Sequence, residues 1–276
     1  PGCPGLFIGF NRHLAWGGSA LGVDSQVVYL EQLTRDGQGF MFQERPVPFE
    51  RRLEQIEVKG GPAVIQEVLT NRHGTVFNSL VKSARAGEAY VCYDAQTMDA
   101  GTSARMMLEV LDAGNWTEFC SALEHYYYPG LHIVYADAEG NVGYHTLVHR
   151  PLTERSPRRA LEGWTGRDEI QGRIPLNDLP HMLNPAAGYV SHANNLPVGS
   201  WYPYDLGLAT GGTGDTSRSW RLRQLLDGDR TFSLDDFERV LHRDDINSNV
   251  AALLPVARKV VEEDQVTDPA VLGLLE

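Results

Sequence analysis

The chain has 276 residues, of which 42% are hydrophobic and 22% charged, and its net charge is −12. This composition is typical of a globular protein. The negative balance argues against a nucleic-acid-binding protein, because a phosphate backbone requires a basic surface. No apolar run approaches the roughly 20 residues that a membrane-spanning helix needs. We therefore expect neither nucleic acid nor a membrane as a partner.

The three cysteines, Cys3, Cys92 and Cys120, are spaced too widely for a CxxC metal or redox pair. Their odd number leaves at least one thiol free, so a disulfide framework is not expected. The chain opens at Pro1 without an initiator methionine or a signal peptide, and it stops at Glu276 within an expected helix. These ends lead us to expect an internal piece of a longer protein.

Strands are expected in the first part of the chain, followed by two helices. Alternating apolar residues predict strands at residues 7–10, 27–30 and 51–58, the first two of them buried. Helical spacing follows at residues 106–111 and 116–125, where Asn115 or Thr117 is a suitable N-cap.

The clearest local pattern is a β-hairpin within residues 131–148. Two apolar runs, residues 132–136 and 142–146, flank residues 137–141, which contain the glycine that such a loop requires. Residues 151–185 are rich in proline and glycine and are expected to be irregular.

The last quarter is expected to be helical, at residues 217–226, 233–242 and 249–263. Ser233 is a suitable N-cap, and Asp235 and Asp236 lie in the first turn, where the helix dipole favours anions. Strands followed by helices predict an α+β fold.

Two patterns superficially resemble a metal site and a phosphate-binding loop, but neither is well supported. His145 and His149 lie four apart on an expected strand, a separation of about 13 Å that is too long for both to bind one zinc ion. Residues 211–217 are rich in glycine, but they lack the lysine of a phosphate-binding loop. A plain loop before a helix is the better interpretation.

Three polar residues leave both a structural and a functional interpretation open. Ser19 lies in a glycine-rich segment, where it is either a candidate nucleophile, for which no partner base is evident, or part of a tight turn whose backbone amides could stabilise an oxyanion. Asn194 belongs to an Asn-Asn pair, which is typical of turns but could also donate to a developing negative charge. Arg218 opens a helix, where a cation opposes the dipole, so it is either solvated or held by a partner.

Several segments, taken together and in order, resemble one family. Residues 7–17 resemble the xxGxNxxxAWG segment of penicillin acylases, residues 135–144 their YADxxGNIGY hairpin, and residues 184–195 their NPxxGYIxxxNN segment. Ser248 and Pro255 continue the resemblance in a later DxxSxxAxxLxP segment. Each motif is weak by itself, but their common order over most of the chain is specific. The resemblance implies part of an αββα N-terminal-nucleophile hydrolase sandwich with antiparallel sheets, a partial β-chain domain over residues 1–276.

The resemblance also implies roles for individual residues. Ala20 matches the position whose backbone N–H forms half of the oxyanion hole, and Asn194 matches the asparagine whose carboxamide forms the other half. Arg218 matches an arginine that organises the site. Positions that line the acyl pocket in the family are matched by Gly18, Gly22 and Leu131, and the glycines imply room for an acyl group larger than phenylacetyl.

Calcium is the one cofactor that the resemblance implies. Asp24 and Asp205 match two carboxylates of the family's calcium site. Val27 stands where a third carboxylate is expected, and valine cannot ligate calcium, which takes six to eight oxygens. A weakened or missing site is therefore expected.

The activity implied is hydrolysis of a linear acyl amide, such as an N-acyl homoserine lactone or a lipopeptide side chain. Penicillin or cephalosporin acylase activity is the enzymatic alternative, and a non-catalytic fragment is the other. In the family an N-terminal serine, freed by autocatalytic processing, is the nucleophile. This chain contains no such serine, so we expect it to need the α-chain and the remainder of the β-chain as partners. A periplasmic or secreted location is implied by the resemblance alone.

Overall fold

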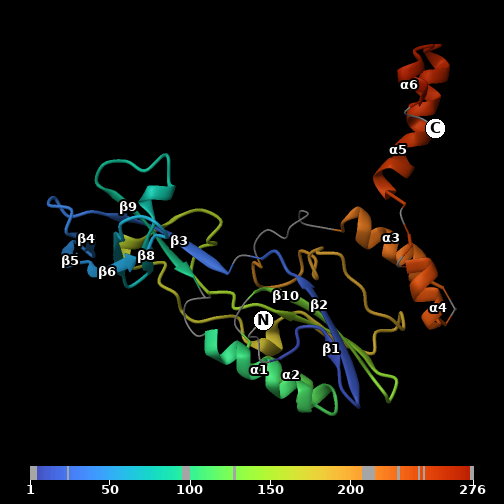
Figure 1. Ribbon diagram of the computed structural model, residues 1–276, viewed down its shortest axis with the longest axis horizontal. Helices are drawn as coiled ribbons and strands as arrows, with labels where there is room; N and C mark the ends of the chain where they lie inside the picture. The colour runs from blue at the N-terminus through green and yellow to red at the C-terminus, as the bar shows by residue number, and fades with distance from the viewer. Residues whose placement is uncertain are drawn as a thin grey trace.

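The computed structural model describes residues 5–23, 25–94, 100–126, 129–206, 215–228, 231–241, 243–244 and 246–273. Its strands form two large sheets and a small hairpin, which Figure 1 shows side by side rather than merged into one sheet. The chain is thus α+β with mainly antiparallel pairing, as predicted from the sequence.

The first large sheet has five strands, in the order β1-β2-β10-β11-β13, and every pairing in it is antiparallel. Its strands are β1 (Gly9–Phe10), β2 (Leu14–Ala20), β10 (Leu131–Asp137), β11 (Val142–Leu147) and β13 (His181–Leu183). The predicted hairpin is confirmed as β10 and β11. Its loop is held by Asp137, whose Oδ1 accepts hydrogen bonds from the backbone N–H groups of Glu139 and Asn141.

Two helices, α1 (Ala100–Asp112) and α2 (Trp116–Leu123), cover one face of this sheet (Figure 1). Of the two predicted caps, Asn115 is the one observed, because its side chain accepts a hydrogen bond from the Glu118 backbone N–H. Trp116 of α2 lies so close to Gly143 of β11 that a Cβ at residue 143 would be 2.6 Å from the indole ring. A larger residue would therefore push the helix off the sheet.

The core between sheet and helices is apolar and aromatic. Leu14 and Trp16 of β2 and Ile133 and Tyr135 of β10 meet Phe119 of α2 in one buried cluster. In β2 and β10 the buried residues alternate with residues of the opposite face, which is the period that a strand with one covered face requires. The opposite face of the same sheet carries the candidate site.

The second large sheet has the order β12-β3-β9-β8-β7-β6. Its strands are β12 (Leu161–Glu162), β3 (Gln26–Gln32), β9 (Glu88–Asp94), β8 (Gly74–Val76), β7 (Val64–Asn71) and β6 (Glu50–Ile56). Strands β4 (Gly39–Phe42) and β5 (Arg45–Pro48) form the separate hairpin. Strand β3 follows β2 directly in the chain, so the segment after Ala20 passes from one sheet to the other.

The C-terminal helices are α3 (Ser217–Leu226), α4 (Leu234–Asp236), α5 (Ser248–Glu263) and α6 (Pro269–Gly273). In Figure 1, α5 and α6 extend away from the rest of the chain. The predicted helix at residues 233–242 begins at the Ser233 cap as expected, but it continues as a π-helix over Phe237–Leu241. Among the described helices, none has the length and apolar character to cross a bilayer.

Two sequence-based expectations were wrong. Residues 7–10 are not a buried strand, because only Gly9–Phe10 pair, at the edge of the sheet, and the Phe10 side chain is 78% exposed. Gly17 to Ala20 do not form a tight turn either, since they belong to strand β2 and pair with β10 along its length. Residues 151–185 are irregular as predicted, apart from the short segments β12 and β13 and two single turns of 3₁₀ helix.

The thiols of Cys92 and Cys120 are free. Burial raises the pKa of both, to about 11 for Cys120, so neither is activated as a nucleophile. Cys3 lies outside the described residues.

A buried cluster of polar side chains joins parts of the second sheet. Glu31 of β3 is fully buried, and its Oε1 lies 2.7 Å from His73 Nδ1 and accepts a hydrogen bond of 2.9 Å from Asn71 Nδ2. The other ring nitrogen of His73 lies 3.1 Å from Glu169 Oε2. The His73 ring also stacks on Tyr29, with 3.6 Å between ring centroids. His73 thus joins the turn between β7 and β8 to β3 and to the irregular segment.

We predict that His73→Ala destabilises the fold by about 3 kcal/mol or more, because it removes the partner of a buried carboxylate that cannot reach water. The midpoint of urea unfolding, followed by tryptophan fluorescence, measures the loss. His125→Ala is the matched control, since His125 pairs with Glu109 near the surface at 3.4 Å and should cost less than about 1 kcal/mol. Equal losses in the two variants would contradict the assignment.

Candidate active site

The candidate site forms where the end of β2 meets a loop far along the chain. Nδ2 of Asn194 donates a hydrogen bond of 2.9 Å to Ser19 Oγ and one of 2.6 Å to the backbone oxygen of Ala20. Residues 19 and 194 are 175 positions apart. The structure therefore brings together the two residues, Ala20 and Asn194, that the sequence predicted as one site.

Arg218 holds the other side of the Asn194 carboxamide. Its Nη2 donates to Asn194 Oδ1 at 2.8 Å and to the backbone oxygen of Ala193 at 3.2 Å. These acceptors offset the unfavourable position of a cation at the start of helix α3. Of the two interpretations left open by the sequence, the arginine with a defined partner is the one observed.

Arg218 also determines which way the carboxamide faces. A guanidinium can only donate, so Asn194 must turn its oxygen toward Arg218 and its NH₂ group toward β2. Both hydrogens of that NH₂ group are directed at the strand end, one at Ser19 Oγ and one at Ala20 O. A substrate oxygen arriving here would compete with the Ser19 hydroxyl for a hydrogen that is already oriented.

The backbone at Asn194 is unusual for a residue other than glycine. Its φ is 59°, in the left-handed region, which asparagine tolerates better than most residues. Asn195 supports the loop, since its Oδ1 accepts a hydrogen bond of 2.9 Å from the Ala193 backbone N–H. Both interpretations of the asparagine pair therefore apply, one to each residue: Asn195 stabilises a turn, and Asn194 presents a hydrogen-bond donor. Strained backbone of this kind is enriched at functional sites.

The three predicted pocket residues lie near the same strand end. Gly18 is opposite Ile133 in the sheet, where a Cβ would come within 3.1 Å of the Ile133 side chain. Leu131 pairs with Ala20 and is buried in the core under the helices. Gly22 lies in a tight turn in which the Val23 backbone N–H donates to Leu21 O at 3.0 Å. Packing accounts for Gly18 and Leu131, and their role in binding an acyl group stays a prediction.

The described residues at the predicted calcium position do not fit that ion. Asp205 receives a hydrogen bond of 2.6 Å from Ser156 Oγ and forms an ion pair of 3.0 Å with Arg158. Val27 is fully buried in β3 and offers no side-chain oxygen. Asp24 lies outside the described residues, and no group of three or more His, Cys, Asp or Glu able to hold a metal occurs within the described ranges. Calcium binding stays a prediction, and the arginine counts against it.

A cavity of about 570 Å³ adjoins the site, between the 192–193 segment, α3 and the start of α5. It is lined by side chains that include His192, Arg218, Arg221 and Asp244. Arg221 and Asp244, which both line it, form an ion pair of 2.7 Å. The cavity therefore offers a polar space directly beside the Asn194–Arg218 pair.

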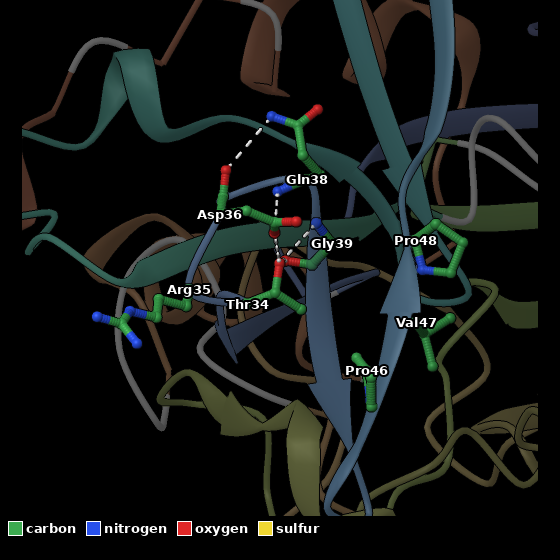
Figure 2. Close-up of a pocket in the computed structure, with 8 residues that line it drawn as sticks. All are labelled: Thr34, Arg35, Asp36, Gln38, Gly39, Pro46, Val47 and Pro48. Carbon is green, nitrogen blue, oxygen red and sulfur yellow. Dashed lines mark hydrogen bonds between the residues drawn. The ribbon is translucent and has the colours of Figure 1, made fainter.

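Another cavity, of about 560 Å³, contains none of the predicted site residues (Figure 2). It lies between the turn after β3 and strand β5. The polar groups that line it bond to one another, as in the hydrogen bonds from Thr34 Oγ1 to Asp36 Oδ1 at 2.6 Å and from Gly39 N to Thr34 Oγ1 at 3.0 Å. Figure 2 shows Arg35 directed away from this group. The cavity is a groove beside a self-contained turn.

A group of buried polar side chains beside the site was not singled out from the sequence. His132 lies directly opposite Ser19 in the register of β10 and β2. Its ring contacts His192, Tyr144 and, through the Tyr144 hydroxyl, Thr146. No sequence pattern indicated this group, because its members come from three separate segments that only the folded structure brings together.

Comparisons with known proteins agree with this geometry. The model of the Penicillin amidase family matches residues 1–276. The fold is similar to that of a thermostable penicillin G acylase from Alcaligenes faecalis, with a TM-score of 0.78 and 23% identity over 99% of this chain and 48% of that one. The fold is therefore that of the N-terminal-nucleophile hydrolases, as the sequence predicted. Because the family model covers the whole chain, the chain belongs to the penicillin amidase family.

Relatives of two kinds are found within the family. Penicillin G acylase from Escherichia coli is 28% identical over 88% of this chain and 29% of its own length. Penicillin acylase 2 proenzyme from Pseudomonas sp. (strain SE83) is 26% identical over 92% of this chain and 32% of its own length. An acyl-homoserine lactone acylase, QuiP from Pseudomonas fluorescens, is 26% identical over 74% of this chain and 26% of its own length. The chain thus spans between a quarter and a third of the length of these curated relatives.

We predict that stability falls as the pH drops from about 6.5 toward 4. Burial lowers the pKa of His132 to about 3 and that of His145, His149 and His192 to about 4. The unfolded chain therefore binds protons at a higher pH than the folded chain does, and the folded state loses stability through that window. Urea midpoints at pH 8, 6.5 and 5 measure the effect. A His145→Phe variant should lose less stability over this range, and an unchanged midpoint in the parent protein would contradict the prediction.

Proposed function

We propose that the protein containing this chain hydrolyses a linear acyl amide and releases a carboxylic acid and an amine. The observation that supports this most directly is the Asn194 carboxamide, oriented by Arg218 against the end of β2 at Ser19 and Ala20. Membership of the penicillin amidase family supports the same reaction class. Because the chain covers only part of its relatives, the activity of the whole protein is itself part of the proposal.

In the proposed reaction a serine outside this chain attacks the amide carbonyl carbon, and its own α-amino group accepts the hydroxyl proton. The carbonyl oxygen becomes an oxyanion, which accepts hydrogen bonds from the Ala20 backbone N–H and from Asn194 Nδ2. The C–N bond then breaks, the amine leaves with a proton, and an acyl-enzyme remains. Water attacks the ester, releasing the acid and restoring the serine.

Arg218 has a positioning role in this proposal. Its hydrogen bond to Asn194 Oδ1 keeps the amide hydrogens directed toward the strand, and it polarises the carboxamide so that the NH₂ group becomes a better donor. A donor that is already oriented needs no reorganisation as charge develops on the carbonyl oxygen, which is the main source of its effect.

The proposed substrate class is an N-acyl homoserine lactone or a lipopeptide side chain, and the alternative is a penicillin or cephalosporin. Relatives named for penicillin and for acyl-homoserine lactones occur at similar identity, 28% and 26%, so they support the acylase class equally. Decanoyl homoserine lactone and penicillin G, assayed side by side with the complete protein, distinguish the two. Autocatalytic processing and an exported location belong to the same proposal, and calcium takes no part in the proposed steps.

The remaining alternative is a fragment without activity of its own. The coding sequence upstream of Pro1 decides this, because an acylase requires a serine there at a self-cleavage junction. We expect residues 1–276 purified alone to show no acylase activity, since the proposed nucleophile lies outside them.

We predict that Asn194→Ala in the complete protein lowers kcat about 100- to 1,000-fold and changes KM little, because the lost donor acts mainly in the transition state. Steady-state kinetics on the better of the two substrates measure this. Asn184→Ala is the matched control, since Asn184 also has a positive φ, of 50°, but lies beside the β10–β11 hairpin loop. An Asn194→Ala enzyme with normal kcat would refute the proposed site.

A further inference from the structure

Two histidine rings stack directly beside the candidate oxyanion site. His132 of β10 is fully buried, and His192 lies two residues before Asn194. Their ring centroids are 4.2 Å apart, and their planes differ by 21°. Because His132 is opposite Ser19, the stack adjoins the strand residue whose hydroxyl accepts a hydrogen bond from Asn194.

The His132 ring is held in place from the neighbouring strand β11. Its Nδ1 lies 2.7 Å from the Tyr144 hydroxyl, which in turn lies 2.9 Å from Thr146 Oγ1. Burial raises the pKa of Tyr144, so this hydroxyl keeps its proton and remains a hydrogen-bonding partner. The sheet thus presents a fixed aromatic surface on which the 192–195 loop can rest.

The contact between the two rings is through their faces. Among the described residues, His132 Nε2 and His192 Nδ1 are buried and have no hydrogen-bond partner. Burial lowers the pKa of both rings, and the neighbouring His192 lowers that of His132 further. The rings are therefore neutral near pH 7, where stacking carries no repulsion between charges.

The loop around Asn194 is held from two opposite sides. On the helix side, Thr216 Oγ1 and Arg218 Nη2 both donate to Ala193 O, at 3.3 and 3.2 Å. On the sheet side, the His192 ring rests on His132. The left-handed backbone of Asn194 lies between these two attachments, so a change in either would alter the direction of its side chain.

We propose that His132 and His192 are positioning residues, and that their stack directs the Asn194 carboxamide at the carbonyl oxygen of the substrate. This inference rests on the proposed function, in which Asn194 is an oxyanion donor. In this inference the stack affects catalysis through the loop that carries Asn194.

The test uses the complete protein and the acyl amide that it turns over faster. We expect His192→Ala to lower kcat about 10- to 100-fold with KM nearly unchanged, because a misdirected donor weakens only the transition state. His192→Phe keeps an aromatic face and should restore most of kcat, which a role for the ring nitrogens would not allow. If His192→Ala does not fold, His192→Leu is tested in its place, because leucine keeps the apolar volume without an aromatic ring. The same loss of kcat is expected for this variant.

His181→Ala is the matched control. His181 also stacks on a buried histidine of the same sheet, His145, with 5.2 Å between centroids, but it lies at the β13 edge. The kcat of the His181→Ala variant should stay within about twofold of that of the parent protein. A loss equal to that of His192→Ala would overturn the inference, since the effect would then follow from disturbing any such pair.

A double-variant cycle separates this inference from the proposed function. If His192 acts only through Asn194, the double variant His192→Ala/Asn194→Ala should have the same kcat as Asn194→Ala. Additive losses would overturn the inference, as would a normal kcat in His192→Ala together with a large loss in Asn194→Ala. A normal kcat in Asn194→Ala would overturn the proposed function, and the inference with it.

Discussion

The pairing of β2 with β10 is the constraint on which the rest of the structure depends. Its register places Ala20 opposite Leu131 and Ser19 opposite His132. One face of the pair then carries apolar residues toward α1 and α2, and the other carries Ser19 and His132 toward the site. A slip of one residue would exchange the two faces, burying the polar groups under the helices and exposing the core.

The site is assembled on this strand pair by segments that have little regular structure of their own. A loop supplies Asn194, and the first turn of α3 supplies Arg218, which determines the orientation of the carboxamide. Backbone in the left-handed region is acceptable here because hydrogen bonds from the start of α3 and the stacked ring of His192 hold the loop. This division, with a rigid sheet as support and a loop as the source of the donor, suits an oxyanion site, which requires accurate placement.

Buried polar groups have two different roles in the two sheets. In the second sheet, Glu31 and His73 join a strand, a turn and the irregular segment, and their role is in stability, although Glu31 Oε2 has no hydrogen-bond partner in the described part of the chain. Beside the first sheet, the rings of His132 and His192 stack on each other and adjoin the site. Burial makes both pairs costly to disturb, and their distance from the candidate site is what distinguishes their roles.

The sequence by itself determined the hairpin at residues 131–148, the Asn115 and Ser233 caps and the helix that starts at residue 217, because these depend on neighbouring residues and on local periodicity. Ordered motifs also identified the family and predicted Asn194 and Arg218 as site residues, which the structure places in contact. Only the tertiary structure decided that Phe10 is exposed, that residues 17–20 are a strand, and that the 132 and 192 rings stack. The register of β2 with β10 and the contact between rings 132 and 192 depend on partners far away in the chain, so no local pattern encodes them.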